Sequence, residues 1–393
     1  VGGEQPSRIA YDRMVFNFPF LPVPGNHDYY DLPIFYGILS ATAWPLRRLL
    51  GSKLDLDVGW HGSEIGNAYA KAFLDYLRAH KLPGELDRHL DAHYTASTST
   101  GRCLRYQPGR FTRLPNRYYT FRSGGIDFFA LDSNTFNEPL PIPKTSEGEI
   151  RRQNLELDRQ KLEKEKLEML EMCDRLNPEI PEAAEQLDDL GAKLEQVDEM
   201  LMDIDKQLSP DRKADTDVEQ LEWLKRRLIE SWGDSQVRGR VMYLHHPPYV
   251  TEATKWNQAQ TLAVRLRLRE VLDAVADAVG EEARGRPLVD LVLTGHAHCL
   301  EYLRTGDTGH GDSGINWIVC GGSGHSSETG GRRIAESLLF VGRSGQGSHK
   351  RRPYSCLRID VLDGTPPKFR IRPLVVERFE GKWQEIAIEP FVI

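Results

Sequence analysis

Cysteine is scarce in this chain, and so are long apolar runs. Only five of the 393 residues are cysteine, and none is spaced as a C-x-x-C pair; they are Cys103, Cys173, Cys299, Cys320 and Cys356. An odd, scattered set argues against a disulfide framework and for a reducing compartment, so a cytoplasmic location is expected. No apolar stretch approaches the roughly 20 residues that a membrane span requires.

Excess positive charge is also missing. The formal net charge is −7, which predicts no general nucleic-acid binding. The sequence contains neither the G-x-S-x-G motif nor a P-loop, so serine-hydrolase and nucleoside-triphosphatase functions have no support. A hydrophobic content of 39% and an aromatic content of 9% are typical of a globular protein, and the length allows one large domain or two ordinary ones.

The sequence does contain four short apolar runs that are each followed by polar, metal-ligating residue types. The runs span residues 18–24, 126–131, 241–244 and 291–294. They lead, in that order, into Gly25-Asn26-His27-Asp28, Asp132-Ser133-Asn134, His245-His246-Pro247-Pro248 and Gly295-His296-Ala297-His298. Apolar runs of this length bounded by Gly and Pro predict buried strands. Ligands gather beyond the carboxyl ends of such strands, so a metal site is expected there.

The three histidine-containing blocks, GNHD, HHPP and GHAH in that order, resemble those of the calcineurin-like metallophosphoesterase family. The resemblance covers about residues 1–300, apart from one insertion. It implies an α/β fold, a four-layer α/β/β/α sandwich. It also implies hydrolysis of phosphomonoesters or phosphodiesters by attack of a metal-bound hydroxide at a two-metal centre. The substrate would be a small-molecule or nucleotide phosphate ester.

The resemblance also implies a set of metal ligands. Asn26, His245 and His296 would surround one metal ion, with Glu4 standing where the family has a bridging Asp. His298 would bind the other ion. Imidazole combined with carboxylate and carboxamide oxygen suits two divalent or trivalent ions of Mn, Fe, Zn, Co or Ni rather than Ca.

Two further residues would act on the substrate. His27 would be the general acid for the leaving alkoxide or would stabilise the phosphoryl charge, and Asp28 would orient it. His246, next to a predicted ligand, would contact substrate or pack. The alternatives are purely structural roles: Asn26 would be a turn residue after Gly25, and His27 and Asp28 would form a structural pair.

The family pattern is incomplete here. Its D-x-H block lies before any position that this chain contains, and its GD block is altered to Gly3-Glu4. The simplest interpretation is a fragment that has lost its first strand. The alternative is a phosphoesterase-fold scaffold with a degraded metal site, which binds a partner through a helical hairpin.

That hairpin is predicted from an abrupt change in composition. We expect residues 1–146 and 216–346 to form two parts of the phosphoesterase domain, 147–215 an inserted antiparallel hairpin, and 347–393 C-terminal strands completing the sandwich. Apolar residues repeat as in a coiled coil, at Leu155, Leu162, Met169, Leu176, Leu187, Leu190, Leu194, Val197, Leu201, Ile204 and Leu208. The hairpin would bind a protein partner, self-associate or pack on itself.

After the insertion, the pattern predicts two helices and a series of strands. Thr216 and Glu219 have capping-box spacing at the start of one helix, and a second amphipathic helix covers 261–279. By the family resemblance, strands at residues 315–320, 354–361, 369–375 and 383–388 would build the second sheet.

Overall fold

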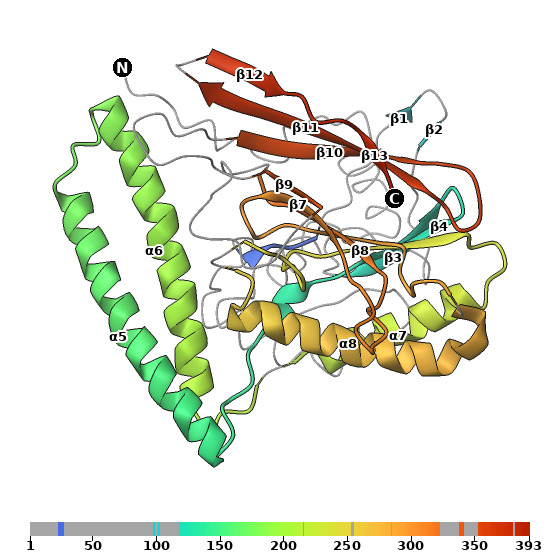
Figure 1. Cartoon of the computed structure of the whole chain (residues 1–393), viewed down its shortest axis with the longest axis horizontal. Coiled ribbons are helices and arrows are strands. Elements are labelled where there is room, and N and C mark those ends of the chain that lie inside the picture. Colours follow the sequence, from blue (N-terminus) through green and yellow to red (C-terminus); the bar gives the residue numbers. More distant parts are fainter. Residues whose placement is uncertain are drawn as a thin grey trace, which may run out of the picture.

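The protein has a mixed α/β fold (Figure 1). The computed structural model describes residues 23–26, 97–98, 101–102, 118–214, 216–252, 255–283, 285–322, 338–341, 353–379 and 382–393. In this part of the chain, a seven-stranded sheet carries helices on one face and a four-stranded sheet on the other. A separate two-stranded ribbon pairs β1 (Ser97–Thr98) with β2 (Gly101–Arg102).

The seven-stranded sheet has parallel strands at its centre. Its order is β3 (Tyr119–Ser123), β4 (Ile126–Ala130), β5 (Gly239–Tyr243), β6 (Leu291–Thr294), β8 (Asn316–Cys320), β7 (Leu300–Arg304) and β9 (Leu339–Val341). Strands β4, β5, β6 and β8 are parallel neighbours, whereas β3, β7 and β9 pair antiparallel toward the edges. The carboxyl ends of the four central strands therefore meet at one edge.

The central strands are apolar along their length because both faces of the sheet are covered. The strands expected within 126–131, 241–244 and 291–294 are confirmed as β4, β5 and β6. The remaining apolar run, residues 18–24, lies mostly outside the described residues, and Val23 and Pro24 belong to no strand.

Helices α7 (Val218–Trp232) and α8 (Ala259–Val279) cover one face. Their apolar sides supply Trp223, Leu224 and Leu272 to the main core, as the amphipathic patterns predicted. The start of α7 differs from the predicted capping box of Thr216 and Glu219. Its N-cap is Asp217, whose carboxylate accepts a hydrogen bond from the Gln220 backbone N–H at 3.0 Å.

The second sheet contains β10 (Pro353–Val361), β11 (Phe369–Phe379), β12 (Lys382–Ile386) and β13 (Phe391–Val392). Its inner face packs on the other side of the large sheet, where Phe369, Ile371 and Val375 join the core formed by the central strands. The strand expected at 315–320 is β8 and belongs to the first sheet, because it pairs with β6. The layers described are α/β/β; the four-layer sandwich remains a prediction.

A long helical hairpin connects β4 to α7. Helices α5 (Ser146–Asp174) and α6 (Pro181–Leu208) lie side by side in Figure 1. Ion pairs from Lys166 to Asp198 at 2.5 Å and from Arg159 to Asp205 at 3.4 Å show that they are antiparallel. The predicted apolar seam lies between them and includes Leu155, Leu162, Met169, Val197, Leu201, Ile204 and Leu208.

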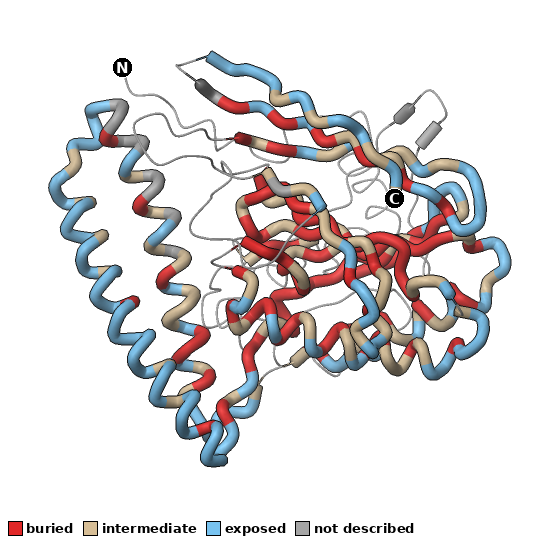
Figure 2. Tube along the Cα trace, in the orientation of Figure 1, coloured by how far each residue is buried: buried red, intermediate tan, exposed pale blue. Residues whose placement is uncertain are grey.

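The two helices differ in burial. Figure 2 shows α5 almost wholly exposed, whereas α6 carries buried positions along its length. Short 3-10 turns follow β4 (η4, Ser133–Thr135) and α8 (η5, Gly280–Ala283). Of the helices in the described part of the chain, none has both the length and the apolar character needed to cross a bilayer.

Candidate metal centre

Histidine blocks from two neighbouring strands meet at the carboxyl edge of the central sheet. The pairing of β5 with β6 continues beyond both strands, because the Gly295 backbone N–H donates to the His245 carbonyl at 2.9 Å. This bond sets HHPP beside GHAH. Parallel pairing thus converts two motifs that are about fifty residues apart in sequence into neighbours in space.

The GHAH block makes a tight turn that places His296 inward. His296 has a φ of 63°, in the left-handed region that non-glycine residues rarely adopt. Gly321, at the end of β8, approaches this turn so closely that a Cβ there would lie 1.9 Å from the Ala297 carbonyl oxygen. Glycine is therefore required at 321 for the turn to sit against β8.

Asn26 joins these histidines from the beginning of the chain. A Cβ at Gly25 would lie 3.0 Å from the His245 ring, so this glycine lets the Gly25-Asn26 backbone pack closely on the imidazole. Asn134, after β4, donates to the Pro24 carbonyl at 3.2 Å and fixes the segment from the other side. The Asn26 Oδ1 consequently lies 2.7 Å from the His245 Nε2.

Three histidines form a compact group at this edge. Ligating nitrogens of His245, His246 and His296 all lie within 4.8 Å of one another, and within the described residues this is the group arranged to hold a metal ion. Burial lowers the pKa of His246 and of His296 well below the usual value; the Lys255 charge lowers both further, whereas Glu199 opposes the shift at His246. Both imidazoles are therefore neutral, which is the form that ligates a metal.

Protein groups contact both ring nitrogens of His246. Nδ1 lies 2.8 Å from the Ser133 hydroxyl, and Nε2 lies 3.3 Å from the Asn137 amide. The Ser133 Oγ also accepts from the His246 backbone N–H at 3.0 Å. His246 is thereby held in a fixed orientation and packs against the His296 ring, with centroids 4.5 Å apart.

Two charged residues reach the site from unexpected places. Glu199 comes from α6 of the helical hairpin, and its Oε1 accepts a short hydrogen bond from the Asn26 amide. Lys255 comes from the loop before α8, and its Nζ lies 3.0 Å from the His296 Nε2 and 3.1 Å from the Glu199 Oε2. Asn26, Glu199, His245, Lys255 and His296 together form what we call the sheet-edge cluster.

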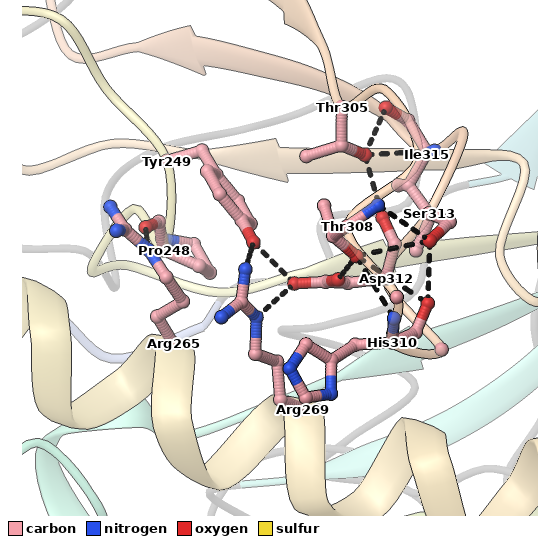
Figure 3. A network of polar contacts seen from close by, with 12 residues as sticks. Pro248, Tyr249, Arg265, Arg269, Thr305, Thr308, His310, Asp312, Ser313 and Ile315 are labelled. Atoms are coloured by element: carbon pink, nitrogen blue, oxygen red, sulfur yellow. Dashed lines mark hydrogen bonds and ion pairs between the residues drawn. The ribbon is translucent and has the colours of Figure 1, made fainter.

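A second polar cluster anchors the loop that follows HHPP (Figure 3). The Asp312 carboxylate accepts from the Tyr249 hydroxyl, from the Thr308 hydroxyl and, at 2.7 Å, from the Arg269 Nε. The Arg265 Nε donates to the Pro248 carbonyl at 2.7 Å, and its guanidinium lies over the Tyr249 ring. These contacts tie residues 248–249 to α8 and to the loop between β7 and β8, and so fix the direction in which HHPP leaves β5. We call this set the Asp312 network.

The structure brings some of the predicted site residues together but not all of them. Asn26, His245 and His296 are brought together, whereas His298 lies two residues beyond His296 and outside the three-histidine group. Glu4, His27 and Asp28 lie outside the described residues.

Sequence reasoning missed Glu199 and Lys255. Neither belongs to a recognisable motif, and Glu199 lies in the hairpin, far from the other site residues in sequence. The one signal was a polar row beside the apolar seam of α6, at Glu199, Asp203 and Gln207, since residues four apart share a helix face.

The donor set fits a transition-metal ion. It combines neutral imidazole nitrogen, a carboxamide oxygen and a carboxylate, which suit Mn, Fe, Zn, Co or Ni. The ammonium of Lys255 lies between the Glu199 carboxylate and the His296 nitrogen, so these two groups already face a positive charge.

No protein-family model matches this chain. No curated protein matches it either. Among solved structures, one described as GAP50, the anchor in the inner membrane complex of Plasmodium, is 15% identical over 44% of this chain and 43% of that one, with a TM-score of 0.24. A structure of PhoD is 14% identical over 43% of this chain and 34% of that one, with a TM-score of 0.21. The matches span less than half of either protein, and likenesses at this level carry no argument about function.

Proposed function

We propose that this chain is a metal-dependent phosphoesterase whose active site is the sheet-edge cluster. The observation that carries the proposal is the meeting of Asn26, His245 and His296 at the carboxyl edge of the parallel strands. The order of the three motifs in the sequence supports it independently. Serine, cysteine or nucleotide-binding chemistry has no comparable set of residues in the described part of the chain.

The roles of the residues follow from their positions. Asn26 Oδ1, His245 Nε2 and His296 Nε2 would hold a metal ion, while His246 and Ser133 support the turn that carries them. Divalent ions in such a site supply a nucleophile at neutral pH and neutralise charge on phosphoryl oxygens. We keep Glu4 and His298 as further proposed ligands of a two-metal centre, and His27 with Asp28 as the proposed acid and its orienting partner.

The test is Mn²⁺-dependent hydrolysis of bis-p-nitrophenyl phosphate and p-nitrophenyl phosphate. The Asn26→Ala variant should lose the metal-dependent rate because it lacks a ligand oxygen. Asn177→Ala is the matched control, since Asn177 lies in the exposed turn between α5 and α6. Equal turnover in wild type and Asn26→Ala would exclude this site as the source of activity.

A second candidate function is partner binding through the hairpin. The outer surface of α5 leaves Ile150, Leu157 and Leu167 between 55% and 63% exposed. Apolar side chains in such positions favour a protein contact, or self-association of two copies. Replacing Leu157 and Leu167 by Lys should shift the mass measured by equilibrium sedimentation if two copies associate; an unchanged monomeric mass in both forms would exclude self-association.

A further inference from the structure

The helical insertion contributes directly to the sheet-edge cluster. Glu199 is the residue that α6 contributes, and both of its carboxylate oxygens accept hydrogen bonds within the cluster. Oε1 accepts from the Asn26 Nδ2, which turns the other end of that amide, Oδ1, toward His245. Oε2 accepts from Lys255 Nζ at 3.1 Å and lies 3.9 Å from the His296 Nε2.

These distances also lie within the range allowed for atoms that share one metal ion. Metal–nitrogen and metal–oxygen bonds are about 2.1 Å long, so two ligands of one ion lie at most about 4.2 Å apart. The pair Asn26 Oδ1 and His245 Nε2, which are hydrogen-bonded at 2.7 Å, meets this limit. The pair Glu199 Oε2 and His296 Nε2, at 3.9 Å, meets it as well.

Lys255 shows that a cation is stabilised between two of these atoms. An ammonium group has three donors and no acceptor, so the His296 Nε2 that it contacts presents its lone pair to the charge. The Lys255 side chain is only 10% exposed and the Glu199 side chain 18%. The cluster is therefore shielded from water, and its carboxylate and imidazole are directed at a positive centre.

The position of Glu199 is fixed by the rest of α6. One turn further on, the Asp203 carboxylate accepts from the Gln260 backbone N–H at 3.2 Å, at the beginning of α8. Another turn on, the Gln207 carbonyl accepts from the Ile142 N–H at 3.0 Å. The polar row Glu199, Asp203 and Gln207 thus attaches α6 to the core, and the hairpin is placed with its carboxylate at the sheet edge.

We propose that Glu199 is a metal ligand of this site, supplied by the helical insertion, with Oε2 on the ion and Oε1 orienting Asn26. This inference rests on the proposed metal centre. Lys255 competes with the ion for Glu199 Oε2 and His296 Nε2. Ligands in other metal sites behave in the same way: the atom that does not bind the ion is hydrogen-bonded, and this bond holds the geometry of the ligand.

The test is Mn²⁺ binding to the full chain, measured by isothermal titration calorimetry. Glu199→Gln keeps the size of the side chain but removes its charge, and should weaken binding by roughly 10- to 100-fold or more. Asp198→Asn removes the same charge one residue away, where it faces Lys166 of α5, and should leave binding unchanged. Lys255→Met should strengthen binding because it removes the competing ammonium.

A spectroscopic readout separates a ligand from a structural ion pair. The visible absorption of bound Co²⁺ should change in band position and intensity in Glu199→Gln and stay as in wild type in Asp198→Asn. Circular dichroism establishes that each variant is folded. If Glu199→Gln does not fold, Glu199→Asp serves instead, and its shorter side chain should give weakened binding and a shifted Co²⁺ spectrum.

Two outcomes distinguish failure of this inference from failure of the proposed function. Mn²⁺ affinity and a Co²⁺ spectrum unchanged by Glu199→Gln, in a chain that hydrolyses phosphate esters, would overturn the role of Glu199 alone. Binding that depends on Glu199 in a chain without any hydrolysis would support the ligand and overturn the phosphoesterase.

Discussion

The sheet-edge cluster and the Asp312 network are both polar and close to HHPP, yet they differ in the groups that they bring together. In the Asp312 network each acceptor meets its own donor: the carboxylate accepts from Tyr249, Arg269 and Thr308. The sheet-edge cluster is also hydrogen-bonded, but its Lys255 ammonium is shared between the Glu199 Oε2 and the His296 Nε2. The first arrangement surrounds a carboxylate with donors, whereas the second places imidazole and carboxylate groups, both of kinds that ligate metals, around one positive charge.

The comparison teaches how to tell a structural network from a ligand site. A buried charge is tolerated when hydrogen bonds satisfy it, and the hydrogen bonds to Asp312 do so. In the sheet-edge cluster, the Glu199 carboxylate and the His296 imidazole are held by one lysine ammonium, with which the proposed metal ion would compete. The two clusters therefore should respond differently to substitution, to metal and to pH.

The largest expected effect comes from breaking the sheet-edge cluster. His296→Ala should lower Mn²⁺-dependent hydrolysis by about 10³-fold, beyond the roughly 10–100-fold cost of removing a group that only supports a ligand. His310→Ala is the control, because His310 lies in the Asp312 loop and pairs with Asp273 at the surface. The measurement is the steady-state rate of hydrolysis by each variant. Similar rates in the two variants would mean that the two clusters do not differ in function.

Breaking the Asp312 network should instead lower stability. Asp312→Ala leaves Arg269 and Tyr249 without their shared acceptor, at a cost of about 2–4 kcal/mol in the free energy of unfolding. Asp307→Ala, in the same loop but exposed, should cost far less. Urea unfolding measures both. If Asp312→Ala abolished Mn²⁺ binding while leaving stability intact, the division between the clusters would be wrong.

The pH dependence of stability sharpens the contrast. Burial raises the pKa of Asp203, which attaches α6 to α8, from its usual 3.8 to about 7. A raised carboxyl pKa gives stability that is present below about pH 4 and lost as pH rises toward 7. The loss is on the order of 2–4 kcal/mol. Asp203→Asn should remove this decline, as urea unfolding between pH 4 and 8 will show; Asp211→Asn, at an exposed position, should keep it.

Asp312 should show the opposite sign. Although burial raises its pKa, hydrogen bonds from Thr308, Tyr249 and Arg269 outweigh burial and lower the pKa below the usual value. Its contribution to stability is then present above the usual carboxyl range and is lost as pH falls through the lowered pKa. An Asp312→Asn variant that lost stability equally at pH 3 and pH 7, relative to wild type, would contradict this.

The smallest effect is expected at an exposed ion pair between the two helices of the hairpin. Lys166 and Asp198 form an ion pair 2.5 Å long with side chains 36% and 49% exposed. Exposed pairs contribute roughly 0–1 kcal/mol, so Lys166→Met should barely change the unfolding midpoint. A drop comparable to that of Asp312→Ala would show that the hairpin depends on surface charge rather than on its apolar seam.

Much of the fold follows from local patterns. The apolar runs before HHPP and GHAH predicted β5 and β6, and the coiled-coil repeat predicted the α5–α6 seam, because side-chain periodicity reports burial directly. The assignment of residues 315–320 to the second sheet was wrong. Strand β8 is apolar like its neighbours, and only its pairing with β6 places it in the first sheet.

The sequence by itself determined the kinds of residue at the site: Asn26, His245 and His296 were predicted from their motifs alone, and the two histidines follow strands as expected. Tertiary structure decided that Glu199 and Lys255 join them. Both are ordinary charged residues in segments whose local pattern says only helix and loop. Their role depends on how α6 docks against the core, and docking is set by contacts such as Asp203 with the N–H of Gln260, which link residues far apart in the chain.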